Sequence, residues 1–129
     1  MRYLGIDYGA KRVGLAISDV AGGFAFPKGD LPNDSSLVGE LIMLATKEHI
    51  DAFVIGDTRT LYGAANPVTA RSDEFASALA SASKLPVHRV GEAWSSAEAM
   101  RYAPAGKRHD DSAAAAIILQ RFLDGSHKV

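Results

Sequence analysis

Five acidic residues of this 129-residue chain stand where a predicted strand ends or a predicted helix begins. Because the carboxyl ends of parallel strands meet at one edge of a sheet, such side chains can gather there. Gathered carboxylates repel one another unless cations neutralise them, and oxygen ligands without cysteine favour Mg²⁺ or Mn²⁺. A site of this kind can hold the metals of an in-line phosphoryl displacement, one activating a water and the other stabilising the leaving oxygen. The five residues are Asp7, Asp57, Glu92, Asp110 and Asp111.

Asp7 has the clearest need for a partner. It ends the apolar run Tyr3-Leu4-Gly5-Ile6, and a carboxylate is depleted in strands and costly to bury. Glycines at positions 5, 9 and 14 leave room for a backbone or a phosphate to approach it. We therefore expect a cation or a pair of hydrogen-bond donors beside Asp7.

The other acids each have a structural alternative. Asp57 fits an ordinary turn, and Glu92 fits a surface loop. Asp111 can cap a helix, a role that is compatible with binding a metal. The four histidines, at 49, 88, 109 and 127, show no spacing suited to zinc. We interpret them as structural or surface residues, with His109 as the one candidate for a nearby proton donor.

The basic residues fall mostly in predicted tips and loops. A net charge of −1 and a pI near 6.4 count against nucleic acid as a partner, because phosphate contacts need Lys and Arg. If these loops converge on one face of the fold, their combined positive charge could still bind nucleic acid. Charged residues in loops are, however, more often exposed to solvent without binding a partner. The candidates for contacting a phosphate backbone are Lys11, Arg12, Arg59, Arg71, Lys107 and Arg108.

The composition predicts one globular domain over residues 1–129. Hydrophobic residues make up 47% and charged residues 22%, an ordinary balance for a chain that buries a core. No apolar run approaches the ~20 residues needed to span a bilayer, and no leader pattern opens the sequence. With no Cys there is neither a disulfide frame nor a thiolate zinc site. We expect a cytoplasmic protein with no membrane partner.

The apolar runs predict an α/β fold, a mixed sheet with helices on its faces. Residues 3–6 and 13–17 flank a polar, glycine-containing tip and predict a β-hairpin. A third strand near Pro27 should lie at an edge or end there, because proline has no N–H. The continuous apolar run 51–56 predicts a strand that is covered on both faces and central in the sheet.

Two helices are predicted in the first two thirds of the chain. Asn33-Asp34-Ser35 offers N-cap residues ahead of a helix over 36–47. Asn66-Pro67 is a start signal for a second helix, with Asn as the cap and Pro in the first turn. The core-facing stripe of this second helix is expected to hold Val68, Phe75, Leu79 and Ala82.

The last third predicts a strand over 86–90, a short helix over 95–102 and a longer helix over 113–123 that ends before Gly125. Four alanines in a row, at 113–116, leave almost no side chain on either face of the longer helix. This helix can therefore pack close against the sheet, which would bring Asp111 near it.

Both ends of the chain resemble the YqgF/RuvX family, whose members are called pre-16S ribosomal RNA nucleases and Holliday-junction-resolvase-like proteins. Residues 4–19, Leu-Gly-Ile-Asp-Tyr-Gly-Ala-Lys-Arg-Val-Gly-Leu-Ala-Ile-Ser-Asp, are close to the family's first motif. Asp111-Ser112 leading into Ile117-Ile118-Leu119-Gln120 is close to its last motif. The resemblance covers nearly the whole chain. It implies an RNase H-like fold with a five-stranded mixed sheet, the first three strands antiparallel, flanked by helices.

The same resemblance implies a metal-dependent phosphodiesterase. Asp7, Glu92 and Asp111 would form the catalytic triad that binds Mg²⁺ or Mn²⁺, and Lys11 and Arg12 would meet the phosphate backbone. The middle of the chain departs from the family. Residues 91–96 read Gly-Glu-Ala-Trp-Ser-Ser where members usually carry Asp-Glu-Arg-hydrophobic-Thr-Thr. The missing arginine removes one fork for pairing with phosphate, and whether Arg59 or Arg71 substitutes for it is open.

The leading interpretation is a hydrolase, an endonuclease that acts on structured RNA in pre-16S rRNA processing during ribosome biogenesis, with ribosomal particles as further partners. A Holliday junction DNA endonuclease is the alternative enzyme, and it would need two active sites and hence a homodimer in place of a monomer. The Asp-x-Gly hairpin also resembles the start of sugar-kinase-like ATPases, which need a second lobe that one domain of this length lacks. A non-catalytic RNA-binding assembly factor is the remaining interpretation.

Overall fold

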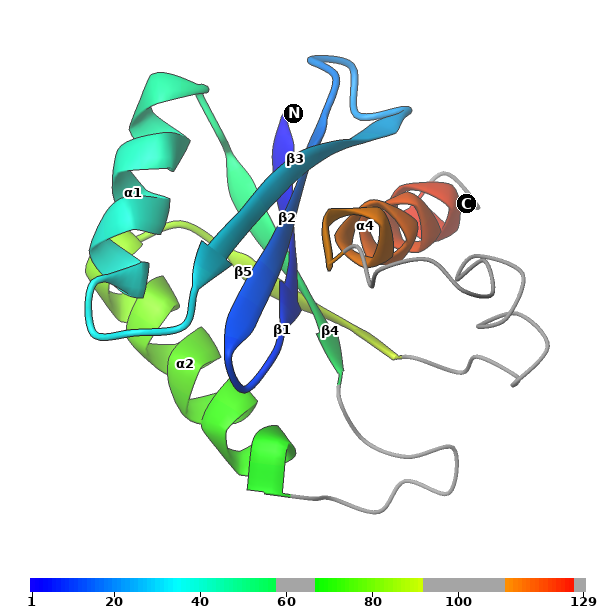
Figure 1. Ribbon diagram of the computed structural model, residues 1–129. Coiled ribbons are helices and arrows are strands. Elements are labelled where there is room, and N and C mark those ends of the chain that lie inside the picture. Colours follow the sequence, from blue (N-terminus) through cyan, green and yellow to red (C-terminus); the bar gives the residue numbers. More distant parts are fainter. Residues whose placement is uncertain (58–66, 92–110, 127–129) are drawn as a thin grey trace, which may run out of the picture.

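The computed structural model describes residues 1–57, 67–91 and 111–126 (Figure 1). The strands are β1 (Tyr3–Tyr8), β2 (Arg12–Ser18), β3 (Ala25–Pro32), β4 (Ala52–Asp57) and β5 (Val87–Gly91). They form one five-stranded sheet in the order β3-β2-β1-β4-β5. The helices within the described residues are α1 (Leu37–Lys47), α2 (Pro67–Ser83) and α4 (Asp111–Ser126).

The sheet is mixed, as predicted. β2 runs antiparallel to both β1 and β3, whereas β4 is parallel to β1 and β5 is parallel to β4. The first three strands therefore form an antiparallel meander. The carboxyl ends of the three parallel strands, β1, β4 and β5, meet at one edge of the sheet, where α/β folds commonly place their sites.

The central strand is β1, so the prediction that residues 51–56 form the centre of the sheet was wrong. β1 is the third of the five strands in the sheet order, between its hairpin partner β2 and β4, and β4 is the fourth. β4 is nevertheless covered on both faces, as predicted, with Phe53 and Val54 fully buried in different cores. A continuous apolar run indicates coverage by helices, but it does not give a strand's place in the sheet order.

β3 is an edge strand, as Pro27 predicted, but it continues beyond that proline to Pro32. The strand tolerates both prolines because one of its sides has no partner in the sheet. Its register against β2 shifts between Leu15 and Ala16, and Gly29 at the shift has a φ of 115°. Glycine suits this position because other residues rarely adopt a positive φ.

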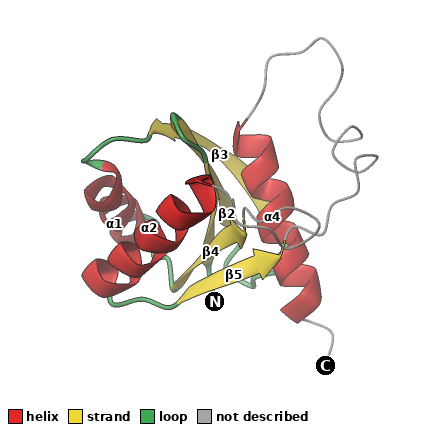
Figure 2. Ribbon diagram, turned by 90° about the horizontal axis from the view of Figure 1, so that it is seen from below, coloured by secondary structure: helices red, strands yellow, loops and turns green. Residues whose placement is uncertain are grey.

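Different helices cover the two faces of the sheet (Figure 2). α1 and α2 cover one face and α4 covers the other. The first core is built mainly from large aliphatic and aromatic side chains, including Leu4, Ile6, Leu41, Phe53, Ile55 and Leu79. Among the described residues, the second core is smaller and includes two alanines; its buried members there are Ala16, Val54, Ala115, Ile118, Leu119 and Leu123.

The helices differ from prediction mainly near their ends. Ala82 is exposed in the last turn of α2, and Leu85, just after the helix, packs against the core in its place. α4 runs through Gly125 to Ser126, because one glycine near a helix end lowers stability by only about 1 kcal/mol. The short helix predicted over 95–102 lies outside the described residues. None of the helices in the described ranges is long and apolar enough to cross a membrane.

Candidate metal centre

Asp7 lies near the end of the central strand, on the face that α4 covers. Side chains alternate between the two faces along a strand. Leu4 and Ile6 belong to the core under α1 and α2, whereas Tyr3 and Gly5 contact α4. Asp7 continues this second series and is half-buried. Its carboxylate therefore belongs to the layer between the sheet and α4.

Glycines flank Asp7 on both neighbouring strands. Gly14 of β2 is its direct partner in the antiparallel pair. On the other side, the parallel register pairs Ile6 with Ile55, so Gly56 comes beside Asp7. Neither neighbouring strand therefore places a side chain beside Asp7. Sequence analysis identified Gly14 but missed Gly56, whose place depends on the β1–β4 register.

α4 packs closely against β1, as its alanines predicted. A Cβ atom built on Gly5 would lie 2.7 Å from the Cβ of Leu119 and 3.2 Å from the carbonyl oxygen of Ala115. A side chain at position 5 would therefore push the helix away from the strand. Gly5 sets the distance between α4 and the strand that carries Asp7.

The direction of α4 brings its first residue level with Asp7. Phe122 packs against Tyr3 at the start of β1, with 5.2 Å between the ring centroids, so α4 runs antiparallel to the strand. Asp111 lies four residues before Ala115, about 6 Å along the helix axis. Asp7 lies two residues beyond Gly5, also about 6–7 Å along the strand. The backbones of Asp7 and Asp111 thus reach the same edge of the sheet.

Of the remaining predicted acids, the structure describes the backbone of Asp57. Asp57 is the last residue of β4 and pairs with Gly91, the last residue of β5. Glu92 follows Gly91 and lies outside the described residues, as does Asp110. Among the side chains that the structure describes, which exclude those of Glu92 and Asp111, no three acidic or histidine side chains come together. The triad of Asp7, Glu92 and Asp111 stays a prediction.

Lys11 and Arg12 lie at the tip of the β1–β2 hairpin, and both are exposed. The Arg12 guanidinium donates two hydrogen bonds to the Asp30 carboxylate, from Nη2 at 2.7 Å and from Nε at 3.0 Å. These bonds hold the pKa of Asp30 below its ordinary value. Within the described residues, the Lys11 ammonium makes no ion pair. Lys11 is thus the hairpin cation that can turn to a phosphate without giving up a carboxylate.

Of the other predicted cations, the structure describes Arg71. Arg71 is exposed near the start of α2, which lies on the opposite face of the sheet from α4. Arg59, Lys107 and Arg108 lie outside the described residues. The described part of the chain therefore places Lys11 and Arg12 on the hairpin that carries Asp7. A basic surface formed by all six predicted cations stays a prediction.

Asn33 has a different role from the predicted N-cap. Its side-chain Nδ2 donates to the carbonyl oxygen of Gly9 at 2.7 Å, and its backbone N–H donates to that of Lys11 at 2.9 Å. Ser36 occupies the N-cap position of α1, without a side-chain capping bond. Sequence reasoning missed this contact because an Asn between a strand and a helix fits both roles.

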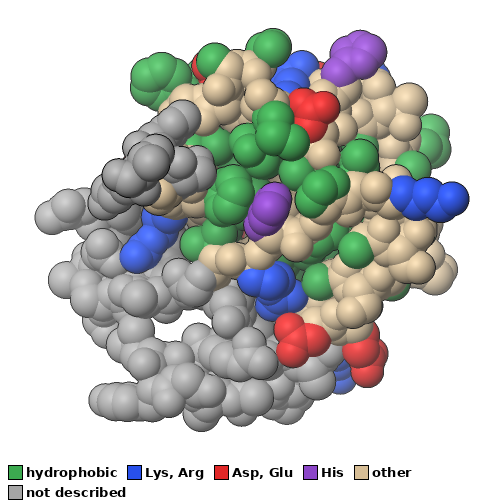
Figure 3. Space-filling view, turned by 180° about the vertical axis from the view of Figure 1, so that it is seen from behind, with side chains coloured by type: hydrophobic (Ala, Val, Ile, Leu, Met, Phe, Trp, Pro, Cys, Tyr) green, Lys and Arg blue, Asp and Glu red, His purple; other side chains and the backbone are tan. Residues whose placement is uncertain are grey.

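His88 has the structural role that we expected. Its ring stacks on Phe122 with 5.0 Å between centroids. Hydrophobic side chains gather around a histidine on the back face of the molecule (Figure 3). His49 is an exposed residue just after α1, and His109 and His127 lie outside the described residues.

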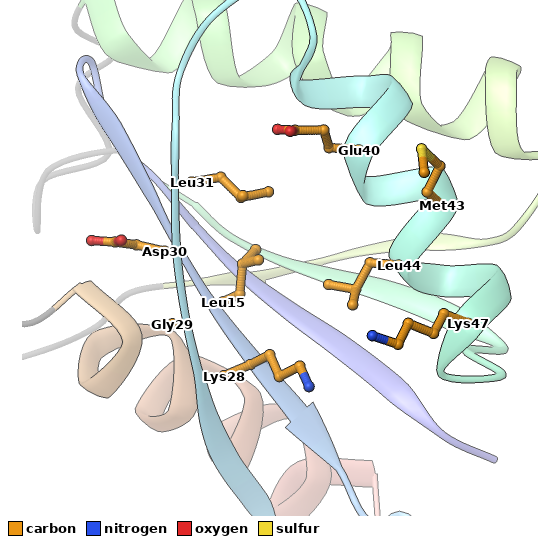
Figure 4. Close-up of a pocket in the computed structure, with 9 residues that line it drawn as sticks. All are labelled: Leu15, Lys28, Gly29, Asp30, Leu31, Glu40, Met43, Leu44 and Lys47. Carbon is orange, nitrogen blue, oxygen red and sulfur yellow. The ribbon is translucent and has the colours of Figure 1, made fainter.

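Two surface grooves lie away from Asp7. The larger, of about 490 Å³, runs between β3 and α1, with the side chains of Leu15, Leu31 and Leu44 along it (Figure 4). The second, of about 440 Å³, lies beside Arg2 and Glu48. Among the predicted site residues whose side chains the structure describes, none lines either groove.

The fold is shared with solved resolvase structures. Thermus thermophilus RuvC, in the structure titled "T. thermophilus RuvC in complex with Holliday junction substrate", matches with a TM-score of 0.61 and 15% identity, covering 99% of this chain and 96% of that one. The Fowlpox virus resolvase, solved with Holliday junction DNA, matches with a TM-score of 0.63 and 12% identity over 99% of this chain and all of that one (100%). These likenesses establish the RNase H-like fold.

The family follows from the sequence comparisons. Residues 1–125 match the profile described as "RuvX: Holliday junction resolvase", and the chain belongs to this family. A Chlorobium luteolum protein named "Putative pre-16S rRNA nuclease" is 39% identical over 133 residues, covering 95% of this chain and 94% of its own. A Nitratidesulfovibrio vulgaris protein with the same name is 36% identical over 133 residues, with 96% and 94% covered.

Proposed function

We propose that this chain is a divalent-metal-dependent endonuclease that hydrolyses phosphodiester bonds in structured RNA. Its role would be pre-16S rRNA processing during ribosome biogenesis, in the cytoplasm. Family membership and the names of the relatives support the reaction and the substrate. The structural observation that carries the proposal is the position of Asp7, a half-buried carboxylate beside glycines and level with the start of α4.

Asp7, Glu92 and Asp111 would hold Mg²⁺ or Mn²⁺. These donors are all oxygen atoms, which suits hard cations, and Gly14 and Gly56 place no side chain beside Asp7. When bound, the metal lowers the pKa of a water and stabilises the charge on the leaving oxygen. Asp7 would contribute from the sheet and Asp111 from the helix, so the ligand geometry depends on how α4 packs on β1.

Lys11 would bind the nucleic-acid backbone beside the metal centre. Its position at the tip of the hairpin suits an electrostatic contact with a phosphate next to the scissile one. In the hydrolysis, a water oxygen bonds to phosphorus as the bond to the leaving oxygen breaks, and the leaving oxygen takes up a proton. Lys11 would hold the strand in place for this displacement without taking part in it.

Cleavage of a Holliday junction is the second candidate, and the family description favours it. A junction has two strands to cut, so this reading needs two active sites and a homodimer. A non-catalytic RNA-binding assembly factor is the third candidate, supported by the altered segment over 91–96. The three candidates differ in substrate and in their need for metal, so one experiment separates them.

The test is single-turnover cleavage of labelled precursor 16S rRNA and of a four-way DNA junction, each with Mn²⁺ or with a chelator. The wild-type chain is compared with Asp7→Asn and with the control Asp124→Asn, which changes an exposed acid on the other end of α4. We expect metal-dependent cutting of RNA that only Asp7→Asn abolishes. Preferred cutting of the junction would select the second candidate, and binding without cutting would select the third.

A further inference from the structure

The tip of the β1–β2 hairpin is fastened from outside the hairpin. Asn33 lies just beyond β3 and is half-buried. Its side chain donates to the Gly9 carbonyl at 2.7 Å, and its backbone N–H donates to the Lys11 carbonyl at 2.9 Å. One residue thus binds both ends of the three-residue connection between β1 and β2.

Two of the three residues of the connection add no packing contact of their own. Ala10 and Lys11 are exposed, so they add no buried contact. The turn is tight, because a Cβ atom on Gly9 would lie 2.4 Å from the carbonyl oxygen of Arg12. Exposed hairpin tips with few buried contacts are among the first parts of a fold to open. We therefore expect the bonds from Asn33 to be needed for the tip to keep one conformation.

Asp30 provides a second attachment from the same side. It accepts both hydrogen bonds from Arg12, the first residue of β2. Asp30 and Asn33 therefore hold consecutive parts of the hairpin against the end of β3. Between these two attachments, the Lys11 side chain extends into solvent.

We propose that Asn33 is a positioning residue for substrate binding, a role that rests on the proposed function. It fixes the backbone of the hairpin tip, so that Lys11 is already directed toward the substrate when a phosphate of the nucleic acid reaches the metal centre at Asp7. A backbone that already has its bound conformation loses less freedom on binding, which strengthens the contact made by the side chain it carries. Without the Asn33 side chain, the same lysine would have to be ordered by the substrate.

The test compares Asn33→Ala and Asn33→Asp with wild type in binding to a labelled precursor 16S rRNA fragment, with Ca²⁺ in place of Mn²⁺, over a range of salt. We expect the half-saturating concentration of RNA to rise about three- to tenfold, the effect of one lost hydrogen bond. The single-turnover cleavage rate at saturating RNA should change less than twofold. The slope of the logarithm of RNA affinity against the logarithm of salt concentration should fall by about one. We expect the same change for Lys11→Ala, because one phosphate contact is lost in each variant.

A double-variant comparison separates this role from a general structural one. In the Lys11→Ala background, Asn33→Ala should weaken binding no further, because the residue acts through Lys11. Asp34→Ala is the matched control. Asp34 is the next residue after Asn33, in the segment between β3 and α1, and its side chain bonds to Ser36 and not to the hairpin. RNA binding by this variant should stay as in wild type. Asn33→Asp keeps the shape and the backbone bond, and it serves as the test if Asn33→Ala does not fold.

Additive losses in the double variant would overturn the proposal, as would unchanged binding in both Asn33 variants. A loss confined to the saturated cleavage rate would also overturn it. If the wild-type chain binds neither the RNA nor a four-way DNA junction, the proposed function itself fails and the role of Asn33 fails with it. The two failures are therefore distinguishable by the behaviour of the wild type.

Discussion

Neighbouring residues of β1 face two layers that are built differently. Leu4 and Ile6 enter a core of large side chains under α1 and α2, and both are fully buried. Gly5 faces α4, and Asp7 continues on that side. Large side chains fill the first layer, whereas a glycine and alanines let the second close up.

The two layers therefore have different roles: the first mainly affects the stability of the fold, and the second affects the position of Asp111 relative to Asp7. In the first layer, burial of large apolar side chains contributes to the driving force for folding. In the second layer, small residues fix how near α4 comes to β1, and so where Asp111 lies relative to Asp7. Substitutions of similar size on the two faces should therefore affect different properties of the protein.

Among substitutions that change only the packing of β1, Gly5→Ala should give the largest effect on cleavage. The added Cβ would lie 2.7 Å from the Cβ of Leu119, so α4 must move away from β1. Such overpacking typically lowers the free energy of unfolding by about 1–3 kcal/mol. A shift of a ligand by about 1 Å can lower a rate by about a hundredfold, so we expect a ten- to hundredfold loss of the single-turnover rate. Chemical denaturation and cleavage assays on the same preparation measure both.

Ile6→Val, on the next residue, is the counterpart on the other face. It removes one methylene from the core under α1 and α2 and should lower the free energy of unfolding by about 0.5–1.5 kcal/mol. The cleavage rate of the folded protein should be unchanged. Equal losses of rate in Gly5→Ala and Ile6→Val would remove the distinction between the two layers.

The smallest predicted effect is on thermal stability, and it comes from the turn over residues 19–25, which is hydrogen-bonded to α4. Gln120 of α4 accepts from Ala25 N–H at 2.9 Å and donates to the Gly23 carbonyl at 3.0 Å. In the same turn, Asp19 accepts backbone hydrogen bonds from Phe24 and Gly23, which hold its pKa below the ordinary 3.8. Its stabilising contribution is therefore complete above about pH 4 and is lost as the pH falls through the folded-state pKa.

Asp19→Asn should accordingly lower the melting temperature slightly at neutral pH. The difference from wild type should shrink below about pH 4, where the wild-type carboxylate becomes protonated. Melting temperatures measured over a pH series check this. A difference that stays constant down to pH 2 would mean that the charge of Asp19 contributes nothing.

Much of this arrangement could be predicted from local sequence. The hairpin, the close packing of α4 and the place of Asp7 at a strand end all follow from patterns within a few residues. The central position of β1 could not be predicted, because it depends on which strand pairs with β4. The register that sets Gly56 beside Asp7 has the same origin.

Polar contacts between residues far apart in the sequence could not be predicted either. Asn33 lies 24 residues from Gly9, and Asp30 lies 18 residues from Arg12. In sequence, Asn33 reads as a helix cap and Arg12 as a free phosphate-binding cation. The structure gives each a tertiary partner, which no short-range pattern could distinguish from the expected role.

Mn²⁺ binding, followed by the electron paramagnetic resonance signal of the free ion, tests the central claim most directly. We predict that Asp7→Asn and Asp111→Asn each weaken binding by at least about tenfold, because each removes a ligand of the same centre. Asp124→Asn, on the far end of α4, should bind as the wild type does. Wild-type affinity in the Asp7→Asn variant would contradict the assignment of this edge of the sheet as the metal centre.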